Sequence, residues 1–353
     1  MWIAWVVYGS LDQPTGGYVY DRMIVEGLTR AGDQVKVLSL QPGAGGSELE
    51  DPLARQRPDV VVIDALCIPD VATRLNARRQ GALVLLVHHL GSWEMEARPS
   101  ERLLAAEAEC LARCPTVVTT SQATAARLGA EAGVRCTVVP PGADRLPQAA
   151  RPARRSAPLR LLMVGSLIPR KRVLDVLAAL EACGTDAFEL RLVGDPTRDC
   201  AYAARVQQTI LGSPRLAARV HCCGVMGDDE LVRELAHADF LVLASSLEGY
   251  GMVLSEARHA GLPILVARTA ALSEVVGAGD DTLVFDGPAH LARTVAELAQ
   301  NTTRRAKHQA AAWACAAKAP AWSDAVCTFR AVLERVVTTR SEPALPPRCA
   351  SAP

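Results

Sequence analysis

The sequence predicts an α/β protein with two doubly wound domains, because short apolar runs alternate with longer amphipathic stretches from end to end. At 353 residues, half of them apolar, the chain is long enough to form two cores. The proline-rich residues 140–158 interrupt the alternation once, and it then restarts. We therefore expect an N-terminal domain over 1–145, a linker over 146–158 and a C-terminal domain over 159–320.

The N-terminal half contains six runs typical of buried strands. They are Ile3–Tyr8, Gln34–Leu40, Asp59–Ile63, Ala82–His88, Thr116–Thr119 and Cys136–Val139. Helical periodicity occurs between some of them, at Tyr20–Ala31 and Arg102–Arg113. The opening Met1–Tyr8 is apolar but lacks a basic segment, and polar residues follow by Ser10. We interpret it as a buried strand and not as a signal peptide.

The C-terminal half begins with a strand at Leu159–Val164 and a helix at Val173–Leu180. Further strands are expected at Glu189–Val193, Arg219–Cys222, Phe240–Ala244, Pro263–Val266 and Thr282–Phe285. A C-terminal helix is expected over 321–340, packing back towards the N-terminal domain. The tail, residues 341–353, is rich in proline, alanine and serine, which predicts disorder.

Composition and motifs argue against several classes of protein. Thirty-eight basic and thirty-eight acidic side chains cancel, which argues against a nucleic-acid partner or a cationic membrane binder. The eleven cysteines show no Cys-x-x-C or zinc spacing, so we expect a reduced, cytosolic protein. No apolar run reaches the roughly eighteen residues that a membrane span needs. Neither a Gly-x-Gly-x-x-Gly turn nor a Walker A pattern occurs, so any nucleotide must be held differently.

The segment 248–256 (Glu-Gly-Tyr-Gly-Met-Val-Leu-Ser-Glu) places two carboxylates on either side of a glycine turn and a helix start. We expect Glu248 and Glu256 to lie roughly 10 Å apart, about the reach of a sugar diphosphate. The unpaired N–H groups of the helix start would attract an anion between them. A plainer alternative stays open, in which the two residues are a capping acid and part of a solvated helix face.

Three further segments carry polar or flexible residues where a strand meets a helix. Adjacent glycines in Pro14–Tyr20 allow a close backbone approach, although a plain tight turn would use the same residues. The segment Val164–Arg172 ends in three cations at a helix start, where the macrodipole disfavours positive charge. We expect either an anionic ligand that compensates them or a solvated basic loop. His88 ends a strand at the edge where open α/β sheets bind ligands, although a single histidine there is more often structural.

Together these positions resemble the retaining glycosyltransferases of family 4, which have two facing Rossmann-like domains in the GT-B fold. The resemblance runs from Gly9 to about Leu298. The matching segments are Thr15–Gly17 for the glycine loop of the family's N-domain, Glu248–Glu256 for its Glu-x7-Glu signature and Leu272–Val276 for the block that follows.

The resemblance implies a role for each matched residue. The catalytic positions would be His88 near the reacting carbon, Glu248 on the hydroxyls of the donor sugar and Lys171 on the leaving phosphate. The donor-binding positions would be Gly16, Gly17, Ser166, Arg170, Lys171, Val225, Gly251, Met252, Val253, Leu254 and Glu256. Among these, Glu256 would bind the ribose and the backbone from Gly251 to Leu254 the diphosphate. The family uses no metal or cofactor, because cations and a helix N-terminus stabilise the leaving group.

This chain departs from the family pattern at two positions of the basic loop. The family usually has Arg where Ser166 stands and Gly where Arg172 stands. Loss of one cation from the leaving-group site would cost several kcal/mol of transition-state stabilisation. Either Arg170 or Arg172 replaces that cation, or the donor differs, or the activity is weak. We favour Arg170.

The resemblance therefore implies a retaining, metal-independent hexosyltransferase that uses a UDP-, GDP- or ADP-linked sugar and a hydroxyl acceptor. The alternatives are a GT-B epimerase or phosphorylase and, because of Ser166, a degenerate protein that binds sugar nucleotides without catalysis. The sequence does not identify the acceptor, and Asp64, His89 and Trp93 are only plausible neighbours. Neither nucleic-acid binding nor membrane association is indicated.

Overall fold

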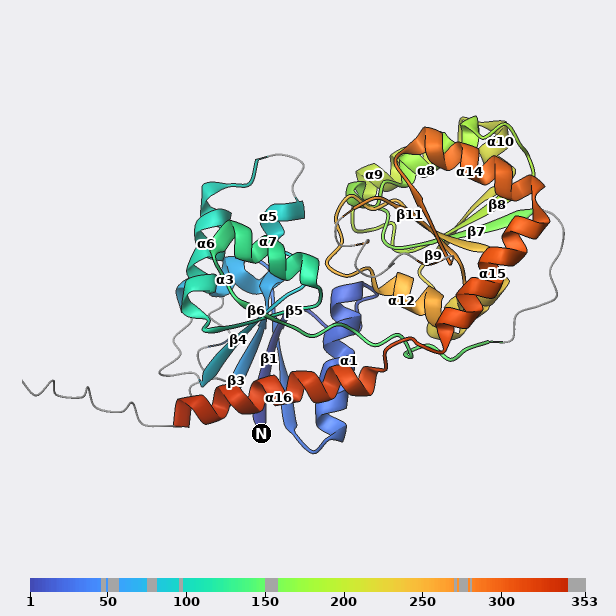
Figure 1. The fold of residues 1–353 in the computed structure, drawn as a ribbon. Helices are drawn as coiled ribbons and strands as arrows, with labels where there is room; N and C mark the ends of the chain where they lie inside the picture. The colour runs from blue at the N-terminus through green and yellow to red at the C-terminus, as the bar shows by residue number, and fades with distance from the viewer. Residues whose placement is uncertain are drawn as a thin grey trace, which may run out of the picture.

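The computed structural model describes residues 1–45, 49, 57–74, 81–94, 98–149, 158–269, 272, 279 and 281–341. They form two parallel sheets of six strands each, in two domains that lie side by side (Figure 1). This arrangement confirms the predicted α/β architecture. Part of the predicted linker (150–157), most of the block at Leu272–Val276, and residues 342–353 of the tail lie outside the described residues.

The first sheet is formed by the N-terminal part of the chain. Its strands are β1 (Trp2–Tyr8), β2 (Gln34–Leu40), β3 (Val60–Asp64), β4 (Ala82–Val87), β5 (Thr116–Thr119) and β6 (Cys136–Val138). They lie in the order β2-β1-β3-β4-β5-β6. The helical segments are α1 (Gly16–Arg30), η2 (Ala65–Cys67), α3 (Ile68–Val71), η3 (Ala72–Arg74), α5 (Gly91–Glu94), α6 (Glu101–Arg113) and α7 (Gln122–Ala132). Strands β3 and β4 are buried along their whole length, as their continuous apolar runs require.

The second sheet has the order β12-β11-β10-β7-β8-β9. Its strands are β7 (Leu159–Val164), β8 (Phe188–Val193), β9 (Val220–Gly224), β10 (Phe240–Leu243), β11 (Ile264–Ala267) and β12 (Thr282–Phe285). The helical segments are η4 (Pro169–Lys171), α8 (Val173–Ala182), α9 (Cys200–Leu211), α10 (Pro214–Ala217), α11 (Asp228–His237), α12 (Met252–His259), α14 (Pro288–Gln300) and α15 (Thr302–Ala316). In both sheets the strand order reverses near the middle, and ligands of open α/β sheets bind outside the strand ends at such a point.

All the strands expected from the sequence occur, with ends shifted by at most two residues. The largest difference concerns the first helix, which begins at Gly16 and not at Tyr20. The two adjacent glycines therefore belong to the first turn of α1, where their low helix propensity costs least because the first N–H groups of a helix have no partner within it.

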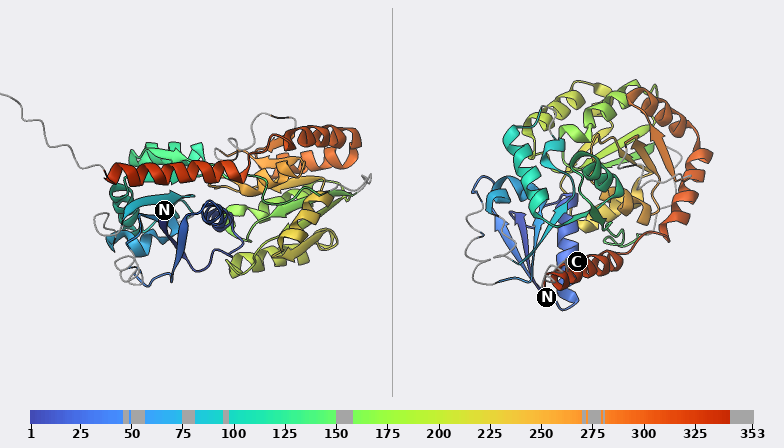
Figure 2. Two further views of the ribbon diagram at one scale, coloured as in Figure 1. Left: turned by 90° about the horizontal axis from the view of Figure 1, so that it is seen from below. Right: turned by 60° about the vertical axis from the view of Figure 1, so that its left-hand side comes forward.

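The last helix, α16 (Trp322–Ser341), returns to the N-terminal domain, where it packs against α1, β3 and β4. Figure 2 shows it lying along that domain. Its apolar residues complete the core on one face of the first sheet, and the rings of Trp5 and Phe329 lie 5.4 Å apart between centroids. No helix of the described ranges is both long enough and apolar enough to cross a membrane.

The chain passes between the two domains twice, and the two passages lie against each other. The N–H of Ala143 donates to the carbonyl oxygen of Pro320 at 2.7 Å, and the N–H of Trp322 donates to Asp144 Oδ1 at 2.7 Å. A Cβ atom on Gly142 would lie 2.2 Å from the backbone nitrogen of Trp322, so only glycine fits there. These contacts fix the backbone on the N-terminal side of the predicted linker.

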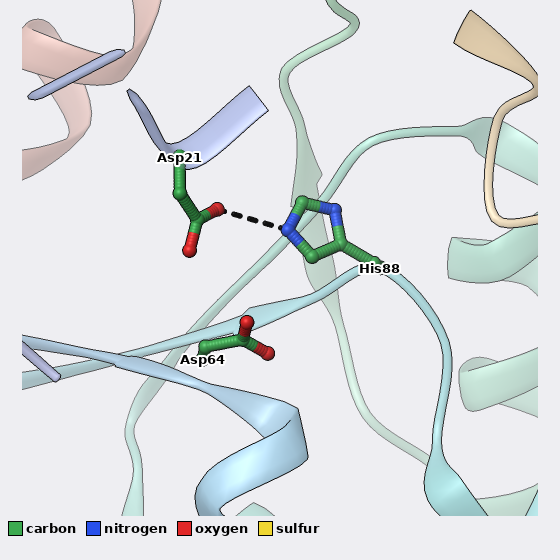
Figure 3. Close-up of side chains that lie close together, drawn as sticks. All are labelled: Asp21, Asp64 and His88. Carbon is green, nitrogen blue, oxygen red and sulfur yellow. Dashed lines mark hydrogen bonds and ion pairs between the residues drawn. The ribbon is translucent and has the colours of Figure 1, made fainter. Parts of the chain in front are cut away.

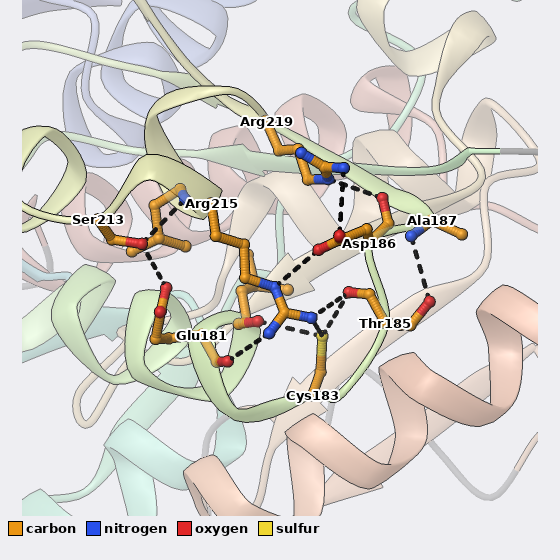
Figure 4. A network of polar contacts seen from close by, with 10 residues as sticks. Glu181, Cys183, Thr185, Asp186, Ala187, Ser213, Arg215 and Arg219 are labelled. Atoms are coloured by element: carbon orange, nitrogen blue, oxygen red, sulfur yellow. Dashed lines mark hydrogen bonds and ion pairs between the residues drawn. The ribbon is translucent and has the colours of Figure 1, made fainter.

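An arginine-centred cluster joins α8, α10 and β8 in the second domain (Figure 4). Arg215 donates to the carbonyl oxygens of Glu181 at 2.9 Å and of Thr185 at 2.5 Å, and its Nε lies 3.1 Å from Asp186 Oδ1. Arg219 Nε donates to the carbonyl oxygen of Asp186 at 2.7 Å. The cluster thereby closes the connection between α8 and β8.

Candidate active site

The turn between β10 and α12 depends on two glycines. Gly251, the N-cap of α12, has a φ of +88°, and a Cβ atom there would lie 3.2 Å from the Leu272 side chain. A Cβ atom on Gly249 would lie 2.3 Å from the carbonyl oxygen of His88, so this turn lies directly against the N-terminal domain. The N-cap residue supplies no side-chain hydrogen bond, which leaves the start of α12 suited to an anion. The N–H of Leu254, expected to face the diphosphate, instead donates to the Gly251 carbonyl at 2.8 Å.

Glu248, at the start of this turn, forms an ion pair with the basic loop that follows β7. Lys171 Nζ donates a hydrogen bond to Glu248 Oε1, and Arg170 Nη1 lies 3.6 Å from Glu248 Oε2. Gly165 leaves room for this arrangement, since a Cβ atom there would lie 3.1 Å from Cε of Lys171. Burial alone would raise the pKa of Glu248, but the two cations outweigh it and lower the pKa. Glu248 is therefore an ionised hydrogen-bond acceptor at neutral pH.

A residue of the N-terminal domain also pairs with this loop. Glu94, in α5, accepts the contact of Arg170 Nε at 2.9 Å and of His89 Nε2 at 2.8 Å on the same oxygen. The contact with His89 is the largest of the effects that lower the pKa of Glu94 to about 2. The two cations of the loop therefore meet two carboxylates, Glu94 and Glu248, which neutralise them.

Glu256, one turn into α12, is buried and paired with an arginine next to the domain crossing. Arg145 Nε lies 2.9 Å and Nη2 lies 2.7 Å from Glu256 Oε1, while Nη1 lies 2.5 Å from Asp228 Oδ1. The side chains of Arg145 and Glu256 are each 8% exposed. Burial raises the pKa of Glu256, although Arg145 opposes this effect. Glu256 is thus neither a capping acid nor part of a solvated helix face.

His88 follows β4 at the carboxyl edge of the first sheet, where it meets two buried aspartates (Figure 3). Its Nε2 lies 2.9 Å from Asp21 Oδ1, and this hydrogen bond outweighs burial and raises the pKa of His88. Asp64 ends β3, and its Oδ2 atom is buried without a hydrogen-bond partner among the described residues. Burial, followed by the charge of Asp21, raises the pKa of Asp64 to about 7. A Cβ atom on Gly17 would lie 3.1 Å from the His88 ring, so the glycine loop closes over this histidine.

The same three side chains have the composition of a metal-binding group. Within the described ranges, one ligand atom each of Asp21, Asp64 and His88 lies within 4.8 Å of the other two. Two carboxylates and an imidazole suit a divalent cation such as Zn²⁺ or Mn²⁺. A pair of protons, one on His88 and one on Asp64, would balance the two carboxylate charges equally well.

The remaining predicted residues lie at separate places in the two domains. Ser166 is buried where β7 ends, and Val225 follows β9 with 52% of its surface exposed, as a residue that contacts a base would be. Met252 packs on the N-terminal domain, where a Cβ atom on Gly16 would lie 3.8 Å from its sulfur. Trp93, considered as an acceptor neighbour, lies in the first domain, with Arg127 stacked 4.0 Å from its ring centroid.

Arg172 does not join the cations beside Glu248. Arg172 has a left-handed φ of +51°. Glycine adopts this conformation most readily, which accounts for the glycine that the family usually has at this position. Arg172 lines a separate cavity of about 190 Å³, whose other polar side chains belong to Asp175, Arg268 and Asp286. Of the two arginines considered as replacements for the missing cation, the structure brings Arg170 to Glu248 and gives no contact between Arg172 and Glu248.

Three partners at the site, Asp21, Glu94 and Arg145, were not identified from the sequence. Each contacts a residue distant in the chain, so no local spacing marks it. The only available signal was chemical, since a carboxylate predicted to be buried, such as Glu256, requires a cation nearby.

Comparisons with known proteins identify the family and the fold. Residues 158–301 match the family described as "Glycosyl transferases group 1", and residues 39–145 match "Glycosyltransferase Family 4". The D-inositol 3-phosphate glycosyltransferase of Acidothermus cellulolyticus is 30% identical over 220 residues, which cover 57% of this chain and 49% of that protein. The match thus spans about half the length of this curated relative.

Solved structures share the fold over nearly the whole chain. Sucrose-phosphate synthase from Thermosynechococcus elongatus superposes with a TM-score of 0.77 at 16% identity, covering 96% of this chain and 99% of that one. Anabaena HepE in complex with UDP-glucose superposes with a TM-score of 0.76 at 17% identity, covering 94% of this chain and 99% of that one.

Proposed function

The chain belongs to glycosyltransferase family 4 and has the GT-B fold, and we propose that it transfers a hexose from a nucleoside diphosphate sugar to a hydroxyl acceptor. We further propose that the transfer retains the anomeric configuration and requires no metal. The observation that carries this proposal is the position of Glu248. It is ionised and held by Lys171 and Arg170 at the start of a glycine turn that leads to α12.

In the proposed complex, the donor lies along this turn. The diphosphate would face the N-terminus of α12, where the macrodipole and unpaired N–H groups favour an anion. Glu248 would accept hydrogen bonds from the sugar hydroxyls, and Glu256 would accept them from the ribose. The contact of Gly249 with His88 supports placing the sugar between the two domains.

Lys171 and Arg170 would stabilise the phosphate as it leaves. Both cations are neutralised by Glu248 and Glu94 in the present structure, and a donor phosphate would compete for them. In the proposed step, the bond between the anomeric carbon and the phosphate oxygen breaks with its electron pair going to the phosphate. The acceptor oxygen bonds to the same face of the carbon, and its proton passes to the leaving phosphate. Preorganised cations of this kind reduce the need for a metal.

The nucleotide and the sugar stay open among the UDP-, GDP- and ADP-linked hexoses. The HepE structure with UDP-glucose favours that donor as the first to test, although its likeness to this chain concerns the fold. A cytosolic location remains a prediction from the sequence. The described residues show no feature that identifies the acceptor.

The test is to incubate the protein with UDP-glucose, GDP-mannose or ADP-glucose and to measure release of the nucleoside diphosphate, with and without a panel of hydroxyl acceptors. Proton NMR of the product or of the free sugar gives its anomeric configuration. We expect one donor to be consumed with retention, at a rate unchanged by EDTA. Tight binding of a donor with no release would favour the non-catalytic binding protein that Ser166 suggests. Inhibition by EDTA would show that the reaction requires a metal, which Asp21, Asp64 and His88 or the donor diphosphate could bind.

A further inference from the structure

Glu256 uses its two carboxylate oxygens differently in this structure. Oε1 receives both Nε and Nη2 of Arg145, at 2.9 and 2.7 Å. No hydrogen bond to Oε2 is found within the part of the chain that the structure describes. One oxygen is therefore committed to the arginine, and the other remains for a ligand.

Arg145 reaches this position because its backbone is fixed nearby. Ala143 and Asp144, the two residues before it, bond to the returning chain at Pro320 and Trp322. From this crossing the side chain enters the C-terminal domain and becomes 92% buried between α11 and α12 (8% exposed). Its third nitrogen, Nη1, contacts Asp228 Oδ1 at 2.5 Å, so the guanidinium is held from two sides.

We propose that Arg145 is a positioning residue for nucleotide binding, which holds Glu256 ionised and turned so that Oε2 accepts the ribose hydroxyls. This inference rests on the proposed role of Glu256. An isolated buried carboxylate takes up a proton readily, and a protonated acid is a poorer acceptor for two hydroxyl groups. The two guanidinium nitrogens on Oε1 oppose protonation and restrict rotation of the carboxylate. Arg145 therefore acts on the ribose through Glu256 and not by direct contact.

The competing interpretation is that Arg145 only joins the domains, or that it blocks the ribose site until it is displaced. These possibilities differ in what they predict for a nucleotide without ribose hydroxyls. A positioning residue affects ribose-containing ligands selectively. If Arg145 is purely structural, its substitution affects the binding of all nucleotides alike. If Arg145 blocks the ribose site, its substitution strengthens nucleotide binding.

The experiment uses isothermal titration calorimetry of the full chain with UDP and with 2′,3′-dideoxy-UDP, and with the GDP and ADP pairs if UDP does not bind. The quantity measured is the ratio of the two dissociation constants. Three variants are compared with the natural protein: Arg145→Met, Arg145→Lys and Glu256→Gln. The matched control is Arg258→Met. Arg258 lies in α12, as Glu256 does, and its Nε forms an ion pair with Oδ2 of the buried Asp281 at 2.8 Å.

We expect Glu256→Gln and Arg145→Met each to reduce the preference for the ribose-containing nucleotide by about tenfold or more, the scale of one hydrogen bond to a charged group. Arg145→Lys should retain part of the preference, and Arg258→Met all of it. In the Glu256→Gln background, Arg145→Met should have little further effect on the ratio, because the two residues act in series.

The outcomes distinguish the ribose-binding role of Glu256 from the positioning role of Arg145. If Glu256→Gln leaves the ratio unchanged, Glu256 does not bind ribose and the proposed donor orientation is wrong. If Glu256→Gln reduces the ratio but Arg145→Met does not, the donor orientation stands and the positioning role is wrong. Tighter UDP binding by Arg145→Met would identify Arg145 as a blocking residue and would also overturn the inference. Thermal unfolding of each variant checks that it is folded at the temperature of titration.

Discussion

Two arginines in the C-terminal domain make comparable numbers of polar contacts but have different kinds of partner. Arg215, at the connection from α8 to β8, donates to two backbone carbonyl oxygens, those of Glu181 and Thr185, and contacts one carboxylate, the exposed Asp186. Arg170, at the edge that faces the other domain, contacts the side-chain carboxylates of Glu94 and Glu248 as well as one carbonyl oxygen. Figure 4 shows the contacts of Arg215, which lie within the C-terminal domain.

The difference indicates which cluster can exchange its partners. Backbone carbonyls in a folded loop have fixed positions, so the two hydrogen bonds that Arg215 donates to them contribute to stability. Side-chain carboxylates can rotate away and leave a cation for a ligand phosphate. We therefore expect substitutions around Arg215 to change the free energy of unfolding, and substitutions around Arg170 to change turnover.

The largest effect is expected for Glu248→Gln. The uncharged amide would lose charged hydrogen bonds to the sugar, so turnover should fall on the order of 10²-fold, the scale of one preorganised group in an active site. Binding of free UDP should stay within a few-fold of the natural protein, because the cations remain. Stopped-flow or coupled assays give turnover, and calorimetry gives the affinity. Equal losses of turnover and of UDP affinity would show that the two glutamates have been assigned the wrong way round.

Arg170→Ala is expected to reduce turnover by about tenfold or more, because one of two cations would be lost from the leaving phosphate. Ser166→Arg should restore much of this loss, since it supplies the cation at the position that the family resemblance implies. In the natural background Ser166→Arg should change turnover little. Comparison of kcat for the four proteins tests this. Unchanged turnover in Arg170→Ala would make Arg170 a bystander and leave the phosphate to Lys171 and the N-terminus of α12.

Arg215→Met tests the other half of the comparison. Two carbonyl oxygens would lose their donor, and we expect the free energy of unfolding to fall by about 1–3 kcal/mol. UDP affinity and turnover should match the natural protein at temperatures where the variant is folded. Denaturant unfolding followed by circular dichroism measures the change. A selective loss of UDP affinity without a loss of stability would remove the distinction between the two clusters.

The smallest effect concerns Asp64 and depends on pH. Its pKa is about 7 in the folded chain and about 3.8 when unperturbed, so between these values the folded state binds more protons. Stability from this group is therefore present below pH 3.8 and lost as pH rises towards 7. Asp64→Asn should remove this loss, so its stability relative to the natural protein should be greater at pH 8 than at pH 5. Unfolding curves at both pH values test this, and an equal difference at both would mean that Asp64 is ionised throughout. The charge of Asp64 also raises the pKa of His88, so the comparison reports the two groups together.

The sequence predicted the fold well because strand patterns are local. The apolar run before Glu248 and the glycines after it were enough to predict β10, the turn and the start of α12. The ion pairs between the domains were not predictable in this way. Arg145 was one of several arginines near the linker, and its distance in sequence from Glu256 left no periodicity to detect. The same holds for Glu94 and Arg170, whose contact depends on how the two domains meet.

The residues of the basic loop also differ in how far the sequence predicts their roles. The family pattern showed the substitution at Ser166 and favoured Arg170 as the replacement cation, and the structure adds that Arg170 lies beside Glu248. Arg172 was equally plausible on charge alone. Its left-handed backbone conformation and its place in a separate cavity distinguish it from Arg170.

The return of α16 to the first domain has a consequence for how the protein is made. Trp322, Phe329 and Leu333 belong to the same core cluster as Trp5 and Ile24. On the ribosome, the first domain therefore emerges with one face of its sheet covered by α1 but not by α16, and it stays so throughout synthesis of the second domain. The second domain can finish folding first, although it is translated later. Exposed apolar surface during that interval is a site where nascent chains aggregate or recruit chaperones, so synthesis at lower temperature should increase the yield of folded protein.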